Sequence, residues 1–102
     1  MLAPIITNNI NEIKTLCKKH YVKELYVFGS AVSDKFNDES DVDLLVEFDS
    51  VDIMEYAENH TSFTESLEKL FGRAVDLVTA KYLRNRFFIK EVNQSKQILF
   101  AA

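Results

Sequence analysis

Apolar and polar residues along the chain follow two different spacings, and the first of these predicts a helix. From Pro4 onward, apolar residues recur at intervals of four, three and four positions, which places them on one face of a helix. Proline fits the first turn of a helix, where its missing N–H is not needed. We therefore expect a helix that begins at Pro4 and ends near His20. Its buried face would carry Ile6, Ile10, Ile13 and Cys17.

Short runs of apolar and β-branched residues predict strands at four places. Residues 24–28 (ELYVF) form the first run and residues 42–48 (VDLLVEF) the second. The second run is too short for a typical helix and strongly apolar, so we expect a central strand there. Residues 73–79 (RAVDLVT) predict a third strand, and residues 98–100 predict a short strand at the edge of the sheet.

Two further helices are predicted between and after these strands. Residues 52–71 form either one helix or two, because Ser62-Phe63-Thr64-Glu65 has the form of a capping box that would start a new helix. Gly72 suits the left-handed backbone conformation that ends a helix. Residues 82–94 predict the last helix. The expected buried residues are Phe63, Leu67, Leu70 and Phe71 in the first segment and Leu83, Phe87 and Val92 in the second.

The order of these elements predicts an α/β fold whose sheet has at least three strands. A chain of 102 residues is about the size of one domain, so residues 1–102 are expected to form a single domain. Apolar residues make up 47% of the chain and charged residues 27%, which is the composition of a folded, soluble protein.

Charge and cysteine content narrow the class of protein. The net charge of −4 and the pI near 5.1 argue against general affinity for nucleic acid, because no basic face is evident to displace phosphate counterions. The single Cys17 excludes an internal disulfide, and no apolar run reaches membrane-spanning length. We expect a soluble cytoplasmic protein with Cys17 in its core and with His20 and His60 at the surface or at helix ends.

Two carboxylates stand at the start of the most apolar strand. Side chains two positions apart point to the same face of a strand, so Asp41 and Asp43 are expected side by side, roughly 7 Å apart at the backbone. Val42, Leu44 and Val46 would then face the core. Two like charges at the edge of an apolar strand repel each other and are costly to desolvate, so a cation is expected beside them.

A third carboxylate, Asp76, lies in the middle of another apolar run. If the two strands are neighbours, Asp43 and Asp76 converge. Magnesium prefers hard oxygen ligands and is usually held by one or two carboxylates together with substrate phosphates. Three carboxylates on adjacent strands are enough for two metal ions about 4 Å apart, the arrangement that serves phosphoryl transfer.

Gly29 and Ser30 supply a candidate phosphate site at the end of the first strand. Glycine lets the backbone approach a ligand, and a serine that opens a helix offers its hydroxyl and free N–H groups. Each feature alone has a plainer interpretation: the acids as solvated residues at strand ends, and the Gly-Ser pair as an ordinary turn. Their occurrence together favours a site that binds a nucleotide and its metals.

Gly29-Ser30, nine intervening residues and then Ser40-Asp41-Val42-Asp43-Leu44 resemble the signature of the minimal nucleotidyltransferases, which belong to the polymerase β-like superfamily. The later Asp76 in its "VDLVT" strand fits the same pattern, and the resemblance covers almost the whole chain. It implies a small mixed sheet flanked by helices. It also implies transfer of a nucleoside monophosphate, AMP from ATP above all, with release of pyrophosphate.

Roles for individual residues follow from the resemblance. Gly29, Ser30 and Ser40 would bind the nucleotide, and Asp41 and Asp43 would bind two magnesium ions. Asp76 would bind the catalytic metal and help to activate the acceptor hydroxyl.

One departure from the family pattern concerns the segment between these residues. Many members carry Arg-Gly where this chain has Ser33 and Asp34, so one contact to a phosphate or a partner is missing and a negative charge is added. Lys35 or Arg84 would be substitutes, although solvated surface charges are the favoured interpretation of both. Glu47, further along the central strand, is likewise interpreted as an exposed strand residue.

Small members of the family are commonly paired with a helical HEPN-type toxin, which they neutralise as an antitoxin. The resemblance therefore implies such a partner, together with ATP or another NTP, without stable binding of nucleic acid or of a membrane. Self-association is left open. An alternative is a non-catalytic protein of the same fold that neutralises its partner by binding alone. A phospho-acceptor domain of the receiver type is disfavoured, because the chain is too short for five parallel strands.

Overall fold

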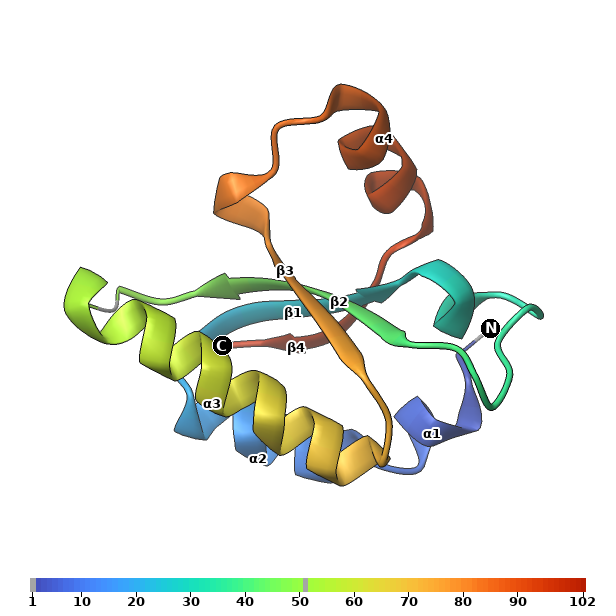
Figure 1. Cartoon of the computed structure of the whole chain (residues 1–102), viewed down its shortest axis with the longest axis horizontal. Helices are drawn as coiled ribbons and strands as arrows, with labels where there is room; N and C mark the ends of the chain where they lie inside the picture. The colour runs from blue at the N-terminus through green and yellow to red at the C-terminus, as the bar shows by residue number, and fades with distance from the viewer. Residues whose placement is uncertain (1, 51) are drawn as a thin grey trace.

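The computed structural model describes residues 2–50 and 52–102. A four-stranded mixed sheet forms the middle layer, with α1, α2 and α3 on one face and α4 on the other (Figure 1). The expected α/β fold with helices on either side of a small sheet is therefore confirmed. The elements are α1 (Pro4–Thr7), α2 (Ile10–Lys19), β1 (Val22–Phe28), the 3-10 turn η1 (Gly29–Val32), β2 (Val42–Phe48), α3 (Ile53–Phe71), β3 (Val75–Thr79), the 3-10 turn η2 (Ala80–Tyr82), α4 (Arg86–Ser95) and β4 (Gln97–Ala101).

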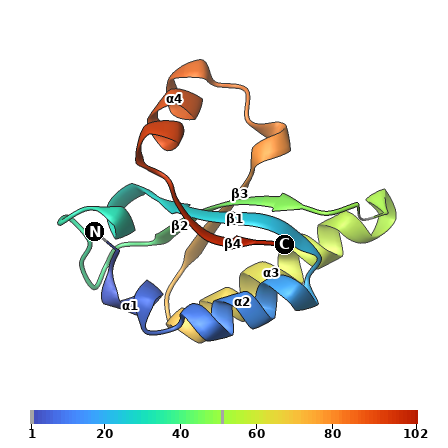
Figure 2. The same cartoon turned by 180° about the vertical axis from the view of Figure 1, so that it is seen from behind.

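The strands lie in the order β3-β2-β1-β4. β2 is central, as predicted, and pairs antiparallel with β1 and parallel with β3. β4 pairs antiparallel with the other side of β1, so the predicted edge strand is confirmed and is longer than expected. Figure 2 shows the same layers from behind, with α4 and the η2 turn above the sheet. β1 begins two residues before the predicted strand, and β3 begins two residues after it.

The main core lies between the sheet and the helices α2 and α3. Alternate residues of β2, including Val42, Leu44 and Val46, are buried there, as their spacing predicted. On α3 the stripe of Phe63, Leu67 and Phe71 is buried, whereas Leu70 is only partly covered. A smaller cluster on the opposite face is formed by Phe28, Leu45 and Val92, and it attaches α4 to the sheet.

The first predicted helix is interrupted, and the 52–71 segment is not. The chain turns at Asn8 and Asn9 between α1 and α2, and the Asn9 side chain donates to the Ile5 carbonyl at 2.8 Å. Asparagine favours such breaks because its side chain competes for backbone groups. α3 is one helix whose N-cap, Asp52, accepts from the Met54 N–H at 2.9 Å. Of the two alternatives for this segment, one continuous helix is therefore confirmed, and Gly72 ends α3 with φ +67°, as predicted.

The prediction for the last helix was wrong at its start and in one buried residue. Residues 80–82 form η2, and α4 begins only at Arg86, because the Asn85 side chain caps it by accepting from the Phe88 N–H at 3.0 Å. This start turns Phe88 toward the sheet and leaves Phe87 86% exposed. In the described part of the chain, no helix is both long and apolar enough to cross a membrane.

His20 lies at a helix end, as expected, because it is the C-cap residue of α2, whereas the expected position of His60 was wrong, because it lies within α3. His20 is only 4% exposed, because its Nδ1 bonds to the Leu16 carbonyl at 2.8 Å and its ring packs on Phe63. Its Nε2 lies 3.2 Å from the Ser62 hydroxyl, so the serine of the expected capping box instead joins α2 to α3. His60 is partly buried against β3. Cys17 is buried as expected, and burial raises the pKa of its thiol to about 12.

Two phenylalanines provide a matched test of this packing. Phe63→Ala removes a fully buried ring, so the free energy of unfolding should fall by about 3–5 kcal/mol. Phe87→Ala removes an exposed ring and should change it by less than about 0.5 kcal/mol. Urea denaturation followed by circular dichroism measures both. Equal losses for the two variants would contradict the placement of α4.

Candidate active site

The parallel pairing of β2 with β3 brings the predicted carboxylates to one end of the sheet. Asp43 and Asp76 are direct register partners, so the two aspartates lie side by side on neighbouring strands, as the sequence suggested. Asp41 lies one residue before β2 and is exposed, as is Asp76, whereas Asp43 is partly buried. The three candidate ligands therefore come from two neighbouring strands and the loop that enters one of them.

The negative charges at this end of the sheet affect the protonation of Asp43. Its pKa is raised above the ordinary value of 3.8, first by burial and then by the negative charges of Asp76 and Asp41. All three effects oppose ionisation of the same carboxyl group. The cluster thus carries negative charge that a cation would stabilise.

Gly29 makes room for Asp43. The residue before it, Phe28, pairs with Asp43 across β1 and β2, and Gly29 itself has φ +72°. A Cβ at this position would collide with Oδ2 of Asp43 and lie 3.3 Å from its Cγ. The sequence assigned Gly29 to close approach of a ligand, and the structure adds that the carboxylate itself needs this space.

The predicted nucleotide-binding serines lie at the two ends of the loop between β1 and β2. Ser30 is in η1 directly after Gly29, and Ser40 directly precedes Asp41. The Ser40 hydroxyl accepts from the Asn37 N–H at 3.0 Å, and its own hydrogen remains available to donate. Both serines are partly exposed beside the carboxylates.

Ser33, at the place of the arginine of many family members, has a local structural role. Its hydroxyl donates to the Ser30 carbonyl at 3.0 Å and accepts from the Lys35 N–H at 3.1 Å. It therefore closes the η1 turn rather than pointing a charge toward a ligand. Lys35 and Asp34 are exposed on the same loop. Arg84 donates to the carbonyls of Lys81 and Leu83, so its guanidinium is engaged at η2.

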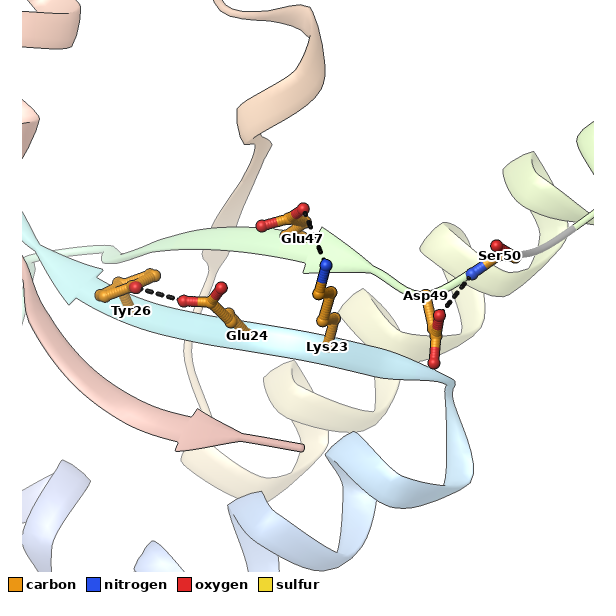
Figure 3. A network of polar contacts seen from close by, with 6 residues as sticks. All are labelled: Lys23, Glu24, Tyr26, Glu47, Asp49 and Ser50. Carbon is orange, nitrogen blue, oxygen red and sulfur yellow. Dashed lines mark hydrogen bonds and ion pairs between the residues drawn. The ribbon is translucent and has the colours of Figure 1, made fainter.

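Glu47 belongs to a different polar group on the same face of the sheet. Its carboxylate lies 3.9 Å from the Lys23 ammonium (Figure 3), and both side chains are about half exposed, as expected for a strand residue facing solvent. A hollow of about 770 Å³ opens near Glu47, Tyr56 and Tyr82. Leu45, which α4 buries, lies between Glu47 and Asp43 along β2. The hollow is thus a separate feature from the carboxylate cluster.

The carboxylates are suited to a metal ion whose remaining ligands come from water and from the phosphates of a bound substrate. Among residues 2–50 and 52–102, no three histidine, cysteine or acidic side chains are close enough to hold a metal by themselves. Magnesium does not require such a cage, since one or two carboxylates, water and substrate phosphates usually complete its shell. The oxygen ligands and the raised pKa of Asp43 fit this kind of site.

Sequence reasoning missed Arg73. One nitrogen of its guanidinium, Nη1, donates to the carbonyls of Asn37 at 2.8 Å and of Ser40 at 2.9 Å. An arginine beside a strand gives no local signal of this role, because its partners lie more than thirty positions earlier in the chain.

The mixed sheet, with acidic residues at the start of two parallel strands beside a Gly-Ser turn, agrees with the family resemblance of the sequence. The family model described as "Nucleotidyltransferase domain" matches residues 10–99. The chain belongs to this family and is a nucleotidyltransferase.

Relatives of similar length carry a more specific name. The chain is 34% identical over 90 residues to the protein adenylyltransferase MntA of Thermococcus cleftensis, covering 82% of this chain and 87% of that protein. It is 33% identical over 93 residues to a Methanocaldococcus jannaschii protein provisionally named as a protein adenylyltransferase, covering 83% and 92%.

Solved structures share the fold. A protein described as a minimal nucleotidyltransferase superposes with a TM-score of 0.76 at 26% identity, covering 95% of both chains. A chain from a toxin–antitoxin complex with AMP-PNP gives 0.71 at 22% identity, covering 92% of this chain and 74% of that one. A chain from the complex of a tri-AMPylated Shewanella oneidensis HEPN toxin with MNT antitoxin gives 0.65 at 20% identity, covering 94% and 72%.

The two glycines provide a matched test of the contact between Gly29 and Asp43. Both have φ near +70°, but a Cβ at Gly72 would meet nothing within 4 Å. Gly72→Ala should therefore lower the free energy of unfolding only by the cost of left-handed backbone, about 1–2 kcal/mol. Gly29→Ala should lower it further, because the new methyl group must displace the Asp43 carboxylate. Urea denaturation measures the difference.

A double-mutant cycle identifies the cause of that difference. In an Asp43→Ala background the carboxylate is absent, so Gly29→Ala should cost no more than Gly72→Ala. An unchanged excess cost in this background would show that the contact with Asp43 is not responsible.

Proposed function

We propose that this chain is a magnesium-dependent protein adenylyltransferase that transfers AMP from ATP to a hydroxyl group of a partner protein. The observation that carries the proposal is the register of Asp43 with Asp76, with Asp41 one residue before β2. The names of the two archaeal relatives support the choice of AMP and of a protein acceptor.

In this reaction the acceptor oxygen attacks the α-phosphorus of ATP, a new P–O bond forms, and the bond to the bridging oxygen of the β-phosphate breaks. Pyrophosphate leaves, and the hydroxyl proton passes to a nearby carboxylate or to solvent. The metal ions, when bound, stabilise the attacking and the leaving oxygens. Gly29, Ser30 and Ser40 would hold the triphosphate at the end of β1.

The three carboxylates would have different roles in the reaction. Asp41 and Asp43 would hold the ions, and Asp76 would bind the catalytic ion and help to activate the acceptor hydroxyl. Catalysis of this kind consists mainly of positioning and electrostatic stabilisation. The carboxylate cluster at the start of β2 and β3 fits that requirement, because the paired strands hold Asp43 and Asp76 in fixed positions.

We further propose that the acceptor is a small helical toxin of the HEPN type and that the chain acts as its antitoxin. Fold neighbours from toxin–antitoxin complexes support this partner. The proposal includes one domain, a cytoplasmic location, and no stable contact with nucleic acid or membranes.

A second function, neutralisation of the partner by binding alone, is favoured by one observation. Ser33 stands where many members have an arginine, and its hydroxyl is used to close the η1 turn. A weakened phosphate site of this kind would leave binding intact and transfer slow.

Removing the ligand carboxylates separates these two functions. The double variant Asp41→Asn with Asp43→Asn should lose transfer of labelled AMP from ATP to a co-expressed HEPN-type partner by at least about 100-fold, because the ions lose their ligands. Asp49→Asn, the same change in an exposed residue just after the opposite end of β2, should transfer normally. Intact protection of cells by the double variant would favour binding alone, whereas a retained complex without protection would exclude it.

The raised pKa of Asp43 predicts a pH-dependent gain in stability from Asp43→Asn. Because the pKa is higher in the folded than in the unfolded state, the protonated carboxyl stabilises the fold, and this stabilisation is lost as the pH rises through the folded pKa. Asparagine stays neutral throughout. Without metal, Asp43→Asn should therefore be more stable than wild type at pH 7, and the difference should shrink toward pH 3.

Urea titrations at several pH values measure this difference, and Asp49→Asn again serves as the control. A variant that is less stable than wild type at pH 7 would show that the charge of Asp43 is already compensated in the free protein.

A further inference from the structure

The Arg73 side chain reaches from the segment between α3 and β3 to the loop between β1 and β2. It lies between the end of α3 and the start of β3 and is partly buried. Its guanidinium stacks over the Phe36 ring, 4.6 Å from the ring centre. Its Nη1 donates to the Asn37 and Ser40 carbonyls at 2.8 and 2.9 Å. Three contacts with one loop thus come from one side chain.

The two carbonyls belong to the turn that directly precedes Asp41. Within this turn the Ser40 N–H donates to the Asn37 carbonyl at 3.1 Å, and the Asn37 N–H donates to the Ser40 hydroxyl at 3.0 Å. Arg73 binds the carbonyls of the first and last residues of the same turn. The position of the Ser40 hydroxyl, a candidate phosphate contact, therefore depends on a turn that the guanidinium holds.

Strand pairing does not by itself fix Asp41. The pairing of β1 with β2 extends only to Phe28 and Asp43, and on the β3 side the Val42 N–H donates to the Ala74 carbonyl at 3.0 Å. Before Val42, the next anchored group is the Ser40 carbonyl, which Arg73 binds. This carbonyl lies in the same planar peptide unit as the Asp41 N–H, so fixing it restricts the orientation of Asp41.

We propose that Arg73 is a positioning residue that orients Asp41 for metal binding by holding the Asn37–Ser40 turn. The inference rests on the proposed function, since it assigns Asp41 to the metal. Lysine would replace it only in part, because an ammonium group offers hydrogen-bond donors but no planar surface for the Phe36 ring.

The test compares Arg73→Ala, Arg73→Lys and Lys69→Ala. Lys69 is an exposed cation in the last turn of α3, so its removal changes the charge equally in the same region. Mn²⁺ binding in the presence of AMP-PNP, followed by electron paramagnetic resonance, reports the metal site without catalysis. Loss of a group that orients a metal ligand weakens metal affinity by about 10–100-fold, and Arg73→Ala should fall in this range.

Two further measurements report on the backbone of the turn and on the reaction itself. Amide hydrogen exchange of residues 38–42 should accelerate in Arg73→Ala, and the Mg²⁺ concentration for half-maximal AMP transfer should rise about 10-fold or more. Arg73→Lys should lie between this variant and wild type and provides the comparison if the alanine variant does not fold. Lys69→Ala should match wild type in all three measurements.

The outcomes distinguish this inference from the proposed function. Wild-type Mn²⁺ affinity in folded Arg73→Ala or Arg73→Lys would overturn the positioning role, even if the unfolding temperature fell, because Arg73 would then be structural only. Weakened Mn²⁺ binding in these variants, with no AMP transfer by the wild-type protein, would support Arg73 and refute the proposed function.

Discussion

The parallel pairing of β2 with β3 is the constraint on which the rest of the structure depends. Parallel neighbours cannot be joined by a tight turn, so the chain must cross over one face of the sheet. The 19-residue helix α3 makes this crossover and supplies Phe63 and Leu67 to the core. The same pairing sets the register in which Asp43 faces Asp76. The parallel pairing of β2 with β3 therefore determines both the position of α3 in the core and the register of the candidate site.

β3 is an edge strand, and side chains of α3 bind its outer edge. In an edge strand, outward N–H and C=O groups lack strand partners. Here the Glu68 carboxylate accepts from the Val75 N–H at 3.1 Å, and the His60 Nε2 lies 3.0 Å from the Leu77 carbonyl. The strand that carries Asp76 is thus held by β2 on one side and by α3 on the other. This explains why polar residues lie on the inner side of an otherwise amphipathic helix.

The sequence predicted those features that depend on near neighbours and missed those that depend on distant ones. The alternation around Asp43 and the helix-ending glycine at position 72 are local signals, and both predictions were confirmed. The burial predicted for Phe87 is an exception, a local error, because the Asn85 cap at the start of α4 sets which face meets the sheet. The burial of the His20 ring was not predicted, because the groups that satisfy the ring lie partly on α3. Arg73 was missed because the carbonyls it binds belong to a separate loop.

The carboxylate end of the sheet links binding to stability through Asp43. Gly29 lets this side chain lie close to the backbone rather than extend into water, and burial with two nearby negative charges then raises its pKa. A bound cation would remove this repulsion, and a ligand that binds only the folded state stabilises that state. Val42 and Leu44, on the opposite face of β2, are fully buried. The core therefore keeps the strand in place, so a metal and a nucleotide bound as proposed would meet carboxylates that are already positioned.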